Sequence, residues 1–179
     1  VVTGRIADAS LLVGPAVHEF GWSFDDWTRL GRATVAGHLI ECGAQATGGM
    51  YSQWNPDSDI SLNQVGYPIA ELDTDGNCAI SKSSNSDGVV NVQTVSEQLV
   101  YEIGDPANYL LPDVACDFSD VRLDEVGENR LRVSNAKGRA PGDSYKVCAT
   151  WVDGYRLMGS AFIGGLRAAE KARCSLNAW

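Results

Sequence analysis

The chain has 179 residues, of which 44% are hydrophobic and 21% charged, a composition typical of one globular domain with a substantial core. Its net charge of -9 argues against nucleic acid as a partner, because phosphate backbones are held mainly by clustered Lys and Arg. The sequence has neither a signal peptide nor a stretch apolar enough to cross a membrane, so we expect a soluble, cytoplasmic protein with no membrane partner.

The first candidate for chemistry is His18, which follows Gly14-Pro15 and precedes Phe20-Gly-Trp22. We expect this segment to be non-helical, so that the imidazole can point into a cleft and move protons there. The alternative is a histidine held in a structural hydrogen bond.

A helix is predicted from about Asp26 to Cys42, with Ser23 or Asp25 as its N-terminal cap and Gly43 just past its end. Its interior contains Gly31 and Gly37, and a glycine there costs roughly 1 kcal/mol relative to alanine. Two such glycines indicate close approach of another backbone or of a ligand.

His38 and Glu41 lie three residues apart on this helix and therefore share a face. The pair suits either general acid and base catalysis or the binding of a divalent metal as a cofactor. A structurally satisfied histidine is the alternative.

The loop after this helix, Gly43-Ala-Gln-Ala-Thr-Gly-Gly49, consists mostly of small residues. Its backbone amides, with Gln45 and Thr47 as side-chain donors beside Gly48 and Gly49, could hold a carboxylate or phosphate despite the global negative charge. The pattern is neither a Walker motif nor a dinucleotide fingerprint. A plain tight loop is the alternative.

Three hairpins are predicted in the second half of the chain, each with turn residues between two short strand-like runs. The paired runs are Ile69–Leu72 with Cys78–Ile80, Val121–Leu123 with Arg130–Val133, and Lys146–Val152 with Tyr155–Ile163. A closing helix is predicted over Leu166–Leu176. The expected fold class is α+β: an antiparallel, hairpin-rich sheet with a few packed helices.

Two long polar loops, Ser52–Gly66 and Ser81–Asn91, resemble lids or binding loops more than idle connections. Lys82 opens the second loop and could be a cationic anchor for an anion. A solvated lysine at the end of a strand is the alternative.

A further helix is predicted to start with a capping box, Thr94-Val-Ser-Glu97, and to end at Gly104. Glu102, and Asp113 beyond the helix, could lie at the rim of a shared pocket. The structural alternative makes Asp105-Pro106 a helix cap and Pro112-Asp113 a turn. No Ser/His/Asp or Cys/His nucleophile motif is recognisable.

Five cysteines are spread along the chain without a Cys-x-x-Cys pair: Cys42, Cys78, Cys116, Cys148 and Cys174. The odd number and the absence of a Cys-x-x-Cys pair favour reduced thiols, most of them in buried or half-buried apolar positions, over disulfides or a zinc site.

Several blocks together resemble the acyclic terpene utilisation protein A family, in order, from about residue 4 to about residue 173. These blocks are Ala7–Pro15, Ala36–Gly49, Gly66–Glu71, Glu97–Asp113 and Tyr145–Thr150. The family tends to have a glycine-rich run after a lysine, whereas this chain has Lys82-Ser-Ser-Asn-Ser-Asp-Gly88. The resemblance implies that residues 1–179 form a single domain, or part of one within a larger α/β protein.

The resemblance also implies a role in pathways that degrade citronellol and geraniol as CoA thioesters. We therefore expect an enzyme of lyase, hydratase or isomerase type that acts on a branched or unsaturated carboxylate or its CoA thioester. The rival expectation is a non-catalytic accessory subunit that binds another pathway enzyme, or a homo-oligomer. A weaker third reading, a fragment of an ATP-dependent ligase, lacks a phosphate-loop pattern.

Overall fold

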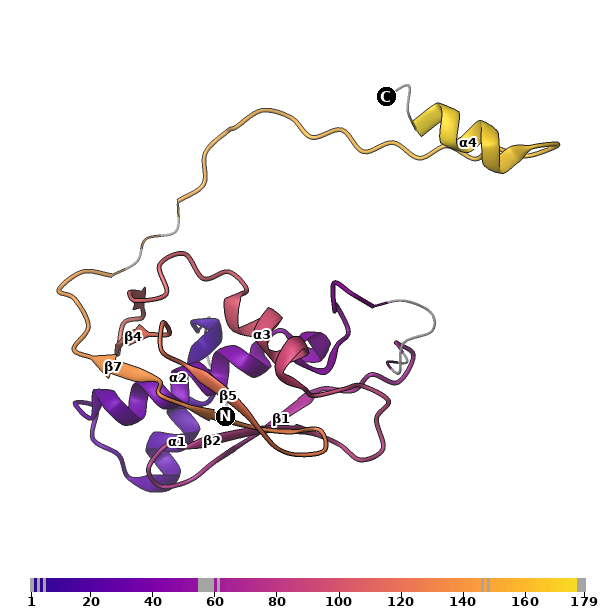
Figure 1. Ribbon diagram of the computed structural model, residues 1–179. Coiled ribbons are helices and arrows are strands. Elements are labelled where there is room, and N and C mark those ends of the chain that lie inside the picture. Colours follow the sequence, from indigo (N-terminus) through magenta and orange to yellow (C-terminus); the bar gives the residue numbers. More distant parts are fainter. Residues whose placement is uncertain are drawn as a thin grey trace. The chain divides into compact units, whose positions relative to one another are not determined.

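The computed structural model of the protein describes residues 2, 4, 6–54, 60, 62–145, 147 and 149–176, with the side chains of 174–176 left out (Figure 1). The chain divides into two units, Val1–Lys146 and Val147–Trp179. The described residues contain helices and two antiparallel sheets, which confirms the predicted α+β class. The extent of the domain, and its place in a larger α/β protein, remain predictions.

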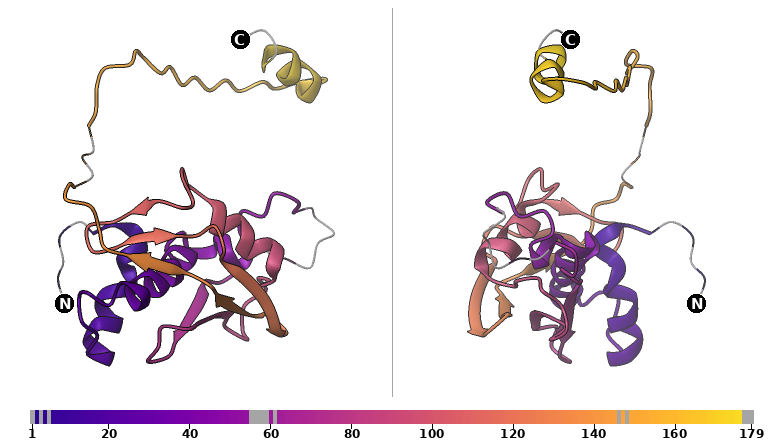
Figure 2. Two further views of the ribbon diagram at one scale, coloured as in Figure 1. Left: turned by 60° about the vertical axis from the view of Figure 1, so that its left-hand side comes forward. Right: turned by 90° about the vertical axis from the view of Figure 1, so that its right-hand side faces the viewer.

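Helix α2 (Trp27–Glu41) is the central element of the first unit (Figure 2). It is in contact with the 3-10 helices η1 (Asp8–Leu11) and η2 (Gly43–Thr47), with α1 (Val13–Phe20) and α3 (Val92–Val100), and with strands of both sheets. Most of its residues from Leu30 to Leu39 are buried. A helix covered on nearly every side needs small and apolar residues all round, which this one has.

The predicted bounds of α2 are confirmed. The predicted cap is wrong: Asp26, rather than Ser23 or Asp25, caps the helix by accepting the amide of Arg29 at 3.2 Å. Gly43, one residue past the Cys42 cap, has a φ of 57°. Gly31 lies against Gly138: a Cβ at Gly31 would come within 2.8 Å of the Gly138 backbone. Close backbone packing therefore explains this helical glycine.

The larger sheet contains β1 (Pro68–Leu72), β2 (Cys78–Lys82), β5 (Arg122–Gly127) and β6 (Arg130–Ser134), in the order β1-β2-β6-β5. Two of the predicted hairpins, β1–β2 and β5–β6, are thereby confirmed. Buried side chains of one face, such as Ile80 and Leu131, belong to the core.

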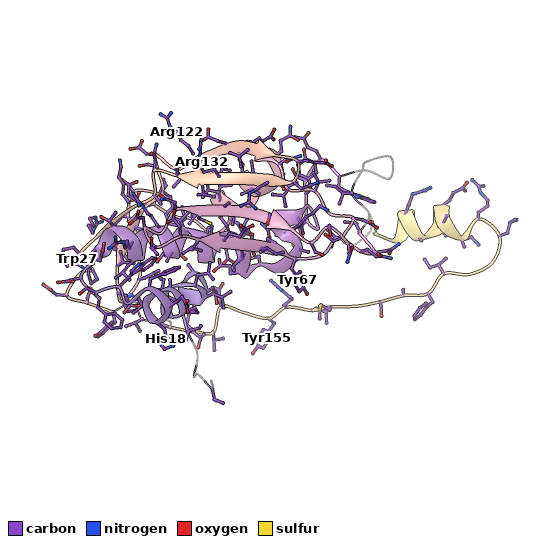
Figure 3. All side chains as sticks on the ribbon, turned by 90° about the horizontal axis from the view of Figure 1, so that it is seen from below. His18, Trp27, Tyr67, Arg122, Arg132 and Tyr155 are labelled. Atoms are coloured by element: carbon purple, nitrogen blue, oxygen red, sulfur yellow. The ribbon has the colours of Figure 1, made fainter. Side chains whose placement is uncertain are left out.

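The other face of this sheet is polar. Arg130 donates both guanidinium nitrogens to Glu71 at 2.5 and 2.8 Å, and Arg132 pairs with Asp124 at 3.4 Å. Figure 3 shows Arg122 and Arg132 on one side of the first unit and His18 on the opposite side. The alternation of apolar and charged residues therefore separates a core face from a solvated face.

The smaller sheet contains β3 (Tyr109–Leu110), β4 (Ala115–Asp117) and β7 (Lys137–Arg139), in that order. The amide of Leu111 donates to the carbonyl of Val114, so that Pro112-Asp113 forms the turn between β3 and β4, as the structural alternative predicted. Asp105 accepts the amide of Ala107 at 3.0 Å and caps a turn rather than a helix.

The predicted start and end of α3 are wrong. The N-cap is Asn91, three residues earlier than predicted: its side chain accepts the Thr94 amide at 2.9 Å, while Thr94 Oγ1 accepts the Asn91 amide. Glu97 instead accepts hydrogen bonds from Ser52. The helix ends at Val100 rather than near Gly104, because Tyr101 is already extended.

In the second unit the predicted hairpin over 146–163 is wrong for the residues that the structure describes, whereas the closing helix is confirmed as α4 (Ala168–Leu176). Lys146 and Cys148, both part of the predicted hairpin, lie outside the described residues. The aromatic side chains of Trp151 and Tyr155 are exposed. An alternating pattern makes a stable hairpin only when its apolar face is covered, since an isolated two-stranded hairpin is marginal in water.

No helix in the described part of the chain combines the length and apolarity that a membrane span requires. Cys78 and Cys116 are buried, and Cys42 is half-buried; all three are free thiols. The prediction of buried or half-buried positions is thus confirmed for these three cysteines. The Cys148 prediction lies outside the described residues, and the side chain of Cys174 is not described.

Candidate functional site

The C-terminal ends of α2 and α3 meet around one histidine. The side chain of His38 is 1% exposed, and its Nδ1 lies 3.1 Å from Glu41 Oε1. Its Nε2 lies 3.2 Å from the carbonyl oxygen of Leu99. The structure thus brings together the pair that the sequence indicated, and adds a partner from α3.

Each ring nitrogen of His38 lies within hydrogen-bond distance of an oxygen atom, one from a side chain and one from the backbone. These two contacts fix the orientation of the imidazole ring. They also leave no nitrogen of His38 free for a substrate.

Glu41 is the member of the pair that has an unused atom. Its side chain is 10% exposed, and within the described residues its Oε2 is buried without a hydrogen-bond partner. Gln98 is similar: Nε2 donates to the carbonyl of His38 at 2.6 Å, and Oε1 is buried and unpaired among the described residues. Since unsatisfied buried acceptors are costly, the site suits an occupant that donates hydrogen bonds.

Aromatic rings cover the other side of His38. Phe118 meets the imidazole edge-on at 5.4 Å between ring centroids, and Tyr109 lies at 6.0 Å. Burial raises the pKa of Tyr109 to about 12, with a further contribution from the Glu41 charge. The environment of the pair is therefore apolar on this side, which strengthens its electrostatic interactions.

Three carboxylates act on Cys42, the residue that follows Glu41. Burial is the main cause that raises the pKa of the Cys42 thiol, and a hydrogen bond with the Gln98 side chain lowers it. The negative charges of Glu41, Glu102 and Asp8 raise this pKa further. Glu102 also raises the pKa of Tyr101, mainly by its charge. Such a potential disfavours an anion beside Cys42 and tolerates a neutral group.

Glu102, predicted as a rim residue, therefore lies in the electrostatic neighbourhood of Cys42 and Tyr109. It adopts a left-handed backbone with a φ of 55°, which is rare for a residue other than glycine. Asp113, the other predicted rim residue, lies in the exposed β3–β4 turn. It makes no side-chain hydrogen bond or ion pair within the described part of the chain.

The non-helical setting predicted for His18 is wrong, because it lies in the last turn of α1. Pro15 is tolerated in the first turn of that helix, where an amide needs no partner within the helix. The His18 side chain is exposed and has no hydrogen bond or ion pair with any other described residue. The structure does not bring it into the His38–Glu41 pair.

The predicted anion loop forms η2, and several of its polar groups are already used. The amides of Gly48 and Gly49 donate to the carbonyls of Gln45 and Ala44. Thr47 Oγ1 lies 2.7 Å from the carbonyl of Gly66 and 3.0 Å from that of Ala44. The buried side chain of Gln45 is the donor that remains without a partner among the described residues.

The Lys82 side chain is hydrogen-bonded to carbonyls of the loop that follows β2. Its Nζ donates to the carbonyl of Ser86 at 2.6 Å and lies 3.4 Å from that of Ser83. The ammonium thus holds the polar loop after β2 in place. Its role as an anion anchor remains a prediction.

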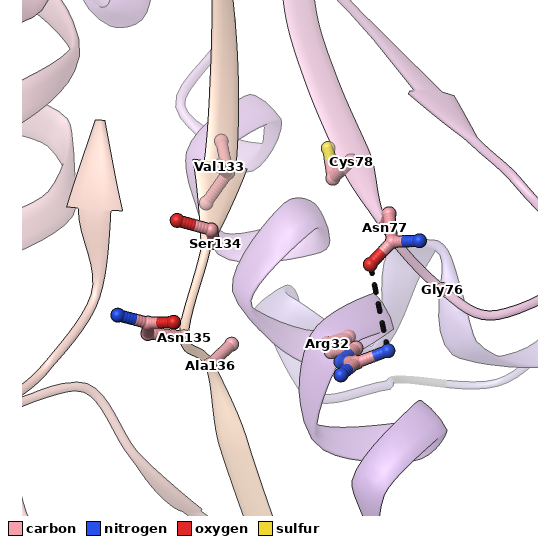
Figure 4. A pocket seen from close by; sticks show the side chains of 8 residues that line it. All are labelled: Arg32, Gly76, Asn77, Cys78, Val133, Ser134, Asn135 and Ala136. Atoms are coloured by element: carbon pink, nitrogen blue, oxygen red, sulfur yellow. Dashed lines mark hydrogen bonds between the residues drawn. The ribbon is translucent and has the colours of Figure 1, made fainter. Parts of the chain in front are cut away.

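Two cavities lie away from the pair. One of about 150 Å³ is lined by Arg32 and by the ends of β2 and β6 (Figure 4). The other, of about 190 Å³, is an apolar groove between α1 and β1. In the described residues no three His, Cys, Asp or Glu side chains gather closely enough to hold a metal ion.

Sequence reasoning missed Gln98, Cys42 and Tyr109 as neighbours of His38. Gln98 and Tyr109 lie within the Glu97–Asp113 block that carries the resemblance, which was the available signal. Their closeness to α2 depends on long-range packing, which no local pattern encodes.

Comparison with known proteins identifies one family. No curated protein and no solved structure matches the chain. The sequence model of one family, "Acyclic terpene utilisation family protein AtuA", matches residues 1–178. Because that match spans almost the whole chain, the protein belongs to the AtuA family of acyclic terpene utilisation.

Proposed function

We propose that the protein is a catabolic enzyme that acts on a branched or unsaturated carboxylate, or its CoA thioester, by lyase, hydratase or isomerase chemistry. Membership of the AtuA family supports the pathway, acyclic terpene utilisation. The observation that supports catalysis is the buried His38–Glu41 pair, in which Glu41 Oε2 has no partner among the described residues.

In this proposal Glu41 is the group that moves the proton. Hydration of a conjugated double bond, and its reverse, transfer a proton at the carbon next to the carbonyl, and isomerisation moves a proton between two carbons. One carboxylate that accepts and returns a proton serves each of these reactions. His38, with a hydrogen-bond partner at each ring nitrogen, positions Glu41.

The charges around Cys42 support the thioester over the free acid as the reacting group. Asp8, Glu41 and Glu102 all act on Cys42 through their negative charge. A free carboxylate would meet repulsion there, whereas a thioester carbonyl is neutral. If the substrate is a thioester, the candidates to bind the phosphates of CoA are the predicted anion-binding residues: Gln45, Thr47, Gly48, Gly49 and Lys82.

The test is turnover of CoA thioesters of acyclic terpenoid acids by the intact protein and by a Glu41→Gln variant, which keeps the shape of the side chain and removes its charge. We expect turnover by the intact protein and a large loss in the variant. Unchanged turnover in the variant would remove Glu41 from the mechanism. His18 has no step in this scheme, and its predicted catalytic role remains untested.

A second candidate function is that of an accessory subunit or homo-oligomer. The observation that favours it is the segment 149–163, in which Trp151, Tyr155 and Phe162 are 77%, 104% and 101% exposed. Exposed aromatic residues are enriched at protein interfaces. Co-purification of a stoichiometric partner, with no stabilisation by any thioester or acid, would support this function over the enzyme.

A further inference from the structure

The cavity at the end of the larger sheet contains an arginine whose charge no carboxylate contacts. Arg32 projects from α2 into this space of about 150 Å³, between the start of β2 and the end of β6 (Figure 4). Its Nη1 donates to the carbonyl of Asp75 at 2.8 Å and lies 3.5 Å from Asn77 Oδ1. Both of these partners are neutral.

A second arginine on the same helix, unlike Arg32, has carboxylates as hydrogen-bond partners. Arg29, one turn before Arg32, donates to Asp26 at 2.8 Å and to Asp75 at 2.9 Å. The carboxylate of Asp75 is thus hydrogen-bonded to Arg29, whereas Arg32 contacts the backbone carbonyl of Asp75. The two arginines share one turn of backbone but differ in their counter-charges.

The remaining acidic side chain nearby is also occupied. Asp73 accepts the amides of Asp75 and Asn77, both at 2.9 Å, and the Asn77 side-chain nitrogen at 2.8 Å. These hydrogen bonds, above all the one from the Asn77 side chain, lower the pKa of Asp73. The charge of Arg32 makes the smallest contribution to this lowering. Asp73 therefore stabilises its own turn and makes no hydrogen bond to the Arg32 guanidinium.

The end of β6 forms the far wall of the cavity, with Ser134 and Asn135 among the residues that line it. Figure 4 shows the side chains of both residues on the side of β6 away from Arg32. Asn135 has a φ of 63°, in the left-handed region. Within the described residues, Nε and Nη2 of Arg32 have no hydrogen-bond partner. The cavity thus presents a cation with spare donors.

We propose that this cavity binds a small oxyanion, a carboxylate or a phosphate group, with Arg32 as its principal ligand. A guanidinium matches the geometry of either oxyanion, because it can donate two parallel hydrogen bonds. Pockets for drug-sized ligands measure roughly 300–1,000 Å³, so the space here fits one anionic group rather than a whole larger molecule. The inference rests on this geometry alone and does not depend on the proposed reaction.

The experiment is a titration of the intact protein with acetate and, separately, with inorganic phosphate, at constant ionic strength set by chloride. Binding is followed by calorimetry and by the NMR signal of the arginine Nε–H groups. We expect saturable binding of at least one anion, with affinity reduced at least tenfold in Arg32→Gln. The anion that binds identifies the ligand class.

The matched control is Arg139→Gln, which removes the same charge from β7 and should change the affinity less than twofold; Arg139 donates to the neutral Asn108, so this change frees no carboxylate. Arg32→Lys keeps the charge without the planar fork, and we expect it to weaken binding at least threefold even if Arg32→Gln does not fold. Non-saturable responses to both anions would overturn the proposal. So would equal losses in the Arg32→Gln and Arg139→Gln variants, since they would reveal a general charge effect.

Discussion

Gly37 of α2 lies directly against Ala9 of η1: a Cβ at Gly37 would come within 2.1 Å of the Ala9 carbonyl oxygen. Real Cβ atoms do not approach an oxygen so closely, so no other residue fits here without movement of the backbone. This contact fixes the N-terminal segment on the helix that carries His38, the next residue. It explains why a residue that disfavours helices stands in the middle of a buried one.

We therefore expect Gly37→Ala to destabilise the protein, by about 1–3 kcal/mol or more, as overpacked core sites do. Gly14→Ala is the matched control, because Gly14 is also helical and nothing lies within 4 Å of its added Cβ. That change should leave stability unaltered or raise it by up to about 1 kcal/mol. Urea unfolding of both variants measures the difference, and equal stabilities would contradict the packing of η1 on α2.

Asn91 is the residue that starts α3, and its replacement tests that assignment. Asn91→Ala removes the acceptor for the Thr94 amide and should cost about 1 kcal/mol, whereas Asn91→Gly should cost only a few tenths. Thermal unfolding monitored by circular dichroism checks both values. If Ala were as stable as the parent, the helix would start elsewhere.

The buried thiols predict a loss of stability at high pH. Burial raises the pKa of both Cys78 and Cys116 from 9.0 to about 12. Above pH 9 the unfolded chain releases these protons while the folded chain keeps them, so stability falls as pH rises from about 9 towards 12. Each thiol contributes a slope of about 1.4 kcal/mol per pH unit in this window.

A double variant, Cys78→Ala with Cys116→Ala, should be less stable at pH 7 because it leaves cavities, but its stability should decline less steeply above pH 9. Denaturant unfolding at several pH values gives the two slopes. Other groups that ionise at high pH affect both proteins alike, so identical slopes would mean that the two thiols titrate normally.

Local patterns were enough to predict much of this fold. The helical pattern and the C-terminal Gly43 located α2 within a residue, although the cap is Asp26 rather than Ser23 or Asp25, and turn residues located the β1–β2 and β5–β6 hairpins. The wrong start of α3 had a local cause: Asn91 and Thr94 both suit a helix cap, and the chain uses Asn91. The choice depends on Thr94 Oγ1, which also donates to the carbonyl of Val89.

The site was predictable only in part. A spacing of three residues on a helix sufficed to pair His38 with Glu41, because helix geometry is local. The hydrogen bond of His38 to the Leu99 carbonyl joins residues 61 positions apart, and no sequence pattern marks it. The sequence also could not predict that Arg32 has no ion-pair partner among the described residues, because this depends on the long-range ion pair between Arg29 and Asp75.

The central claim is that Glu41 transfers a proton in acyl-CoA catabolism, and the direct measurement is the turnover rate of terpenoid CoA thioesters by three proteins. These are the intact protein, Glu41→Gln, and Glu71→Gln, a control that removes a carboxylate from the polar face of the sheet. We predict a loss of at least about 100-fold for Glu41→Gln, typical of a missing general base, and near-parental rates for Glu71→Gln. Parental rates in Glu41→Gln, or no turnover of any thioester by the intact protein, would contradict the claim.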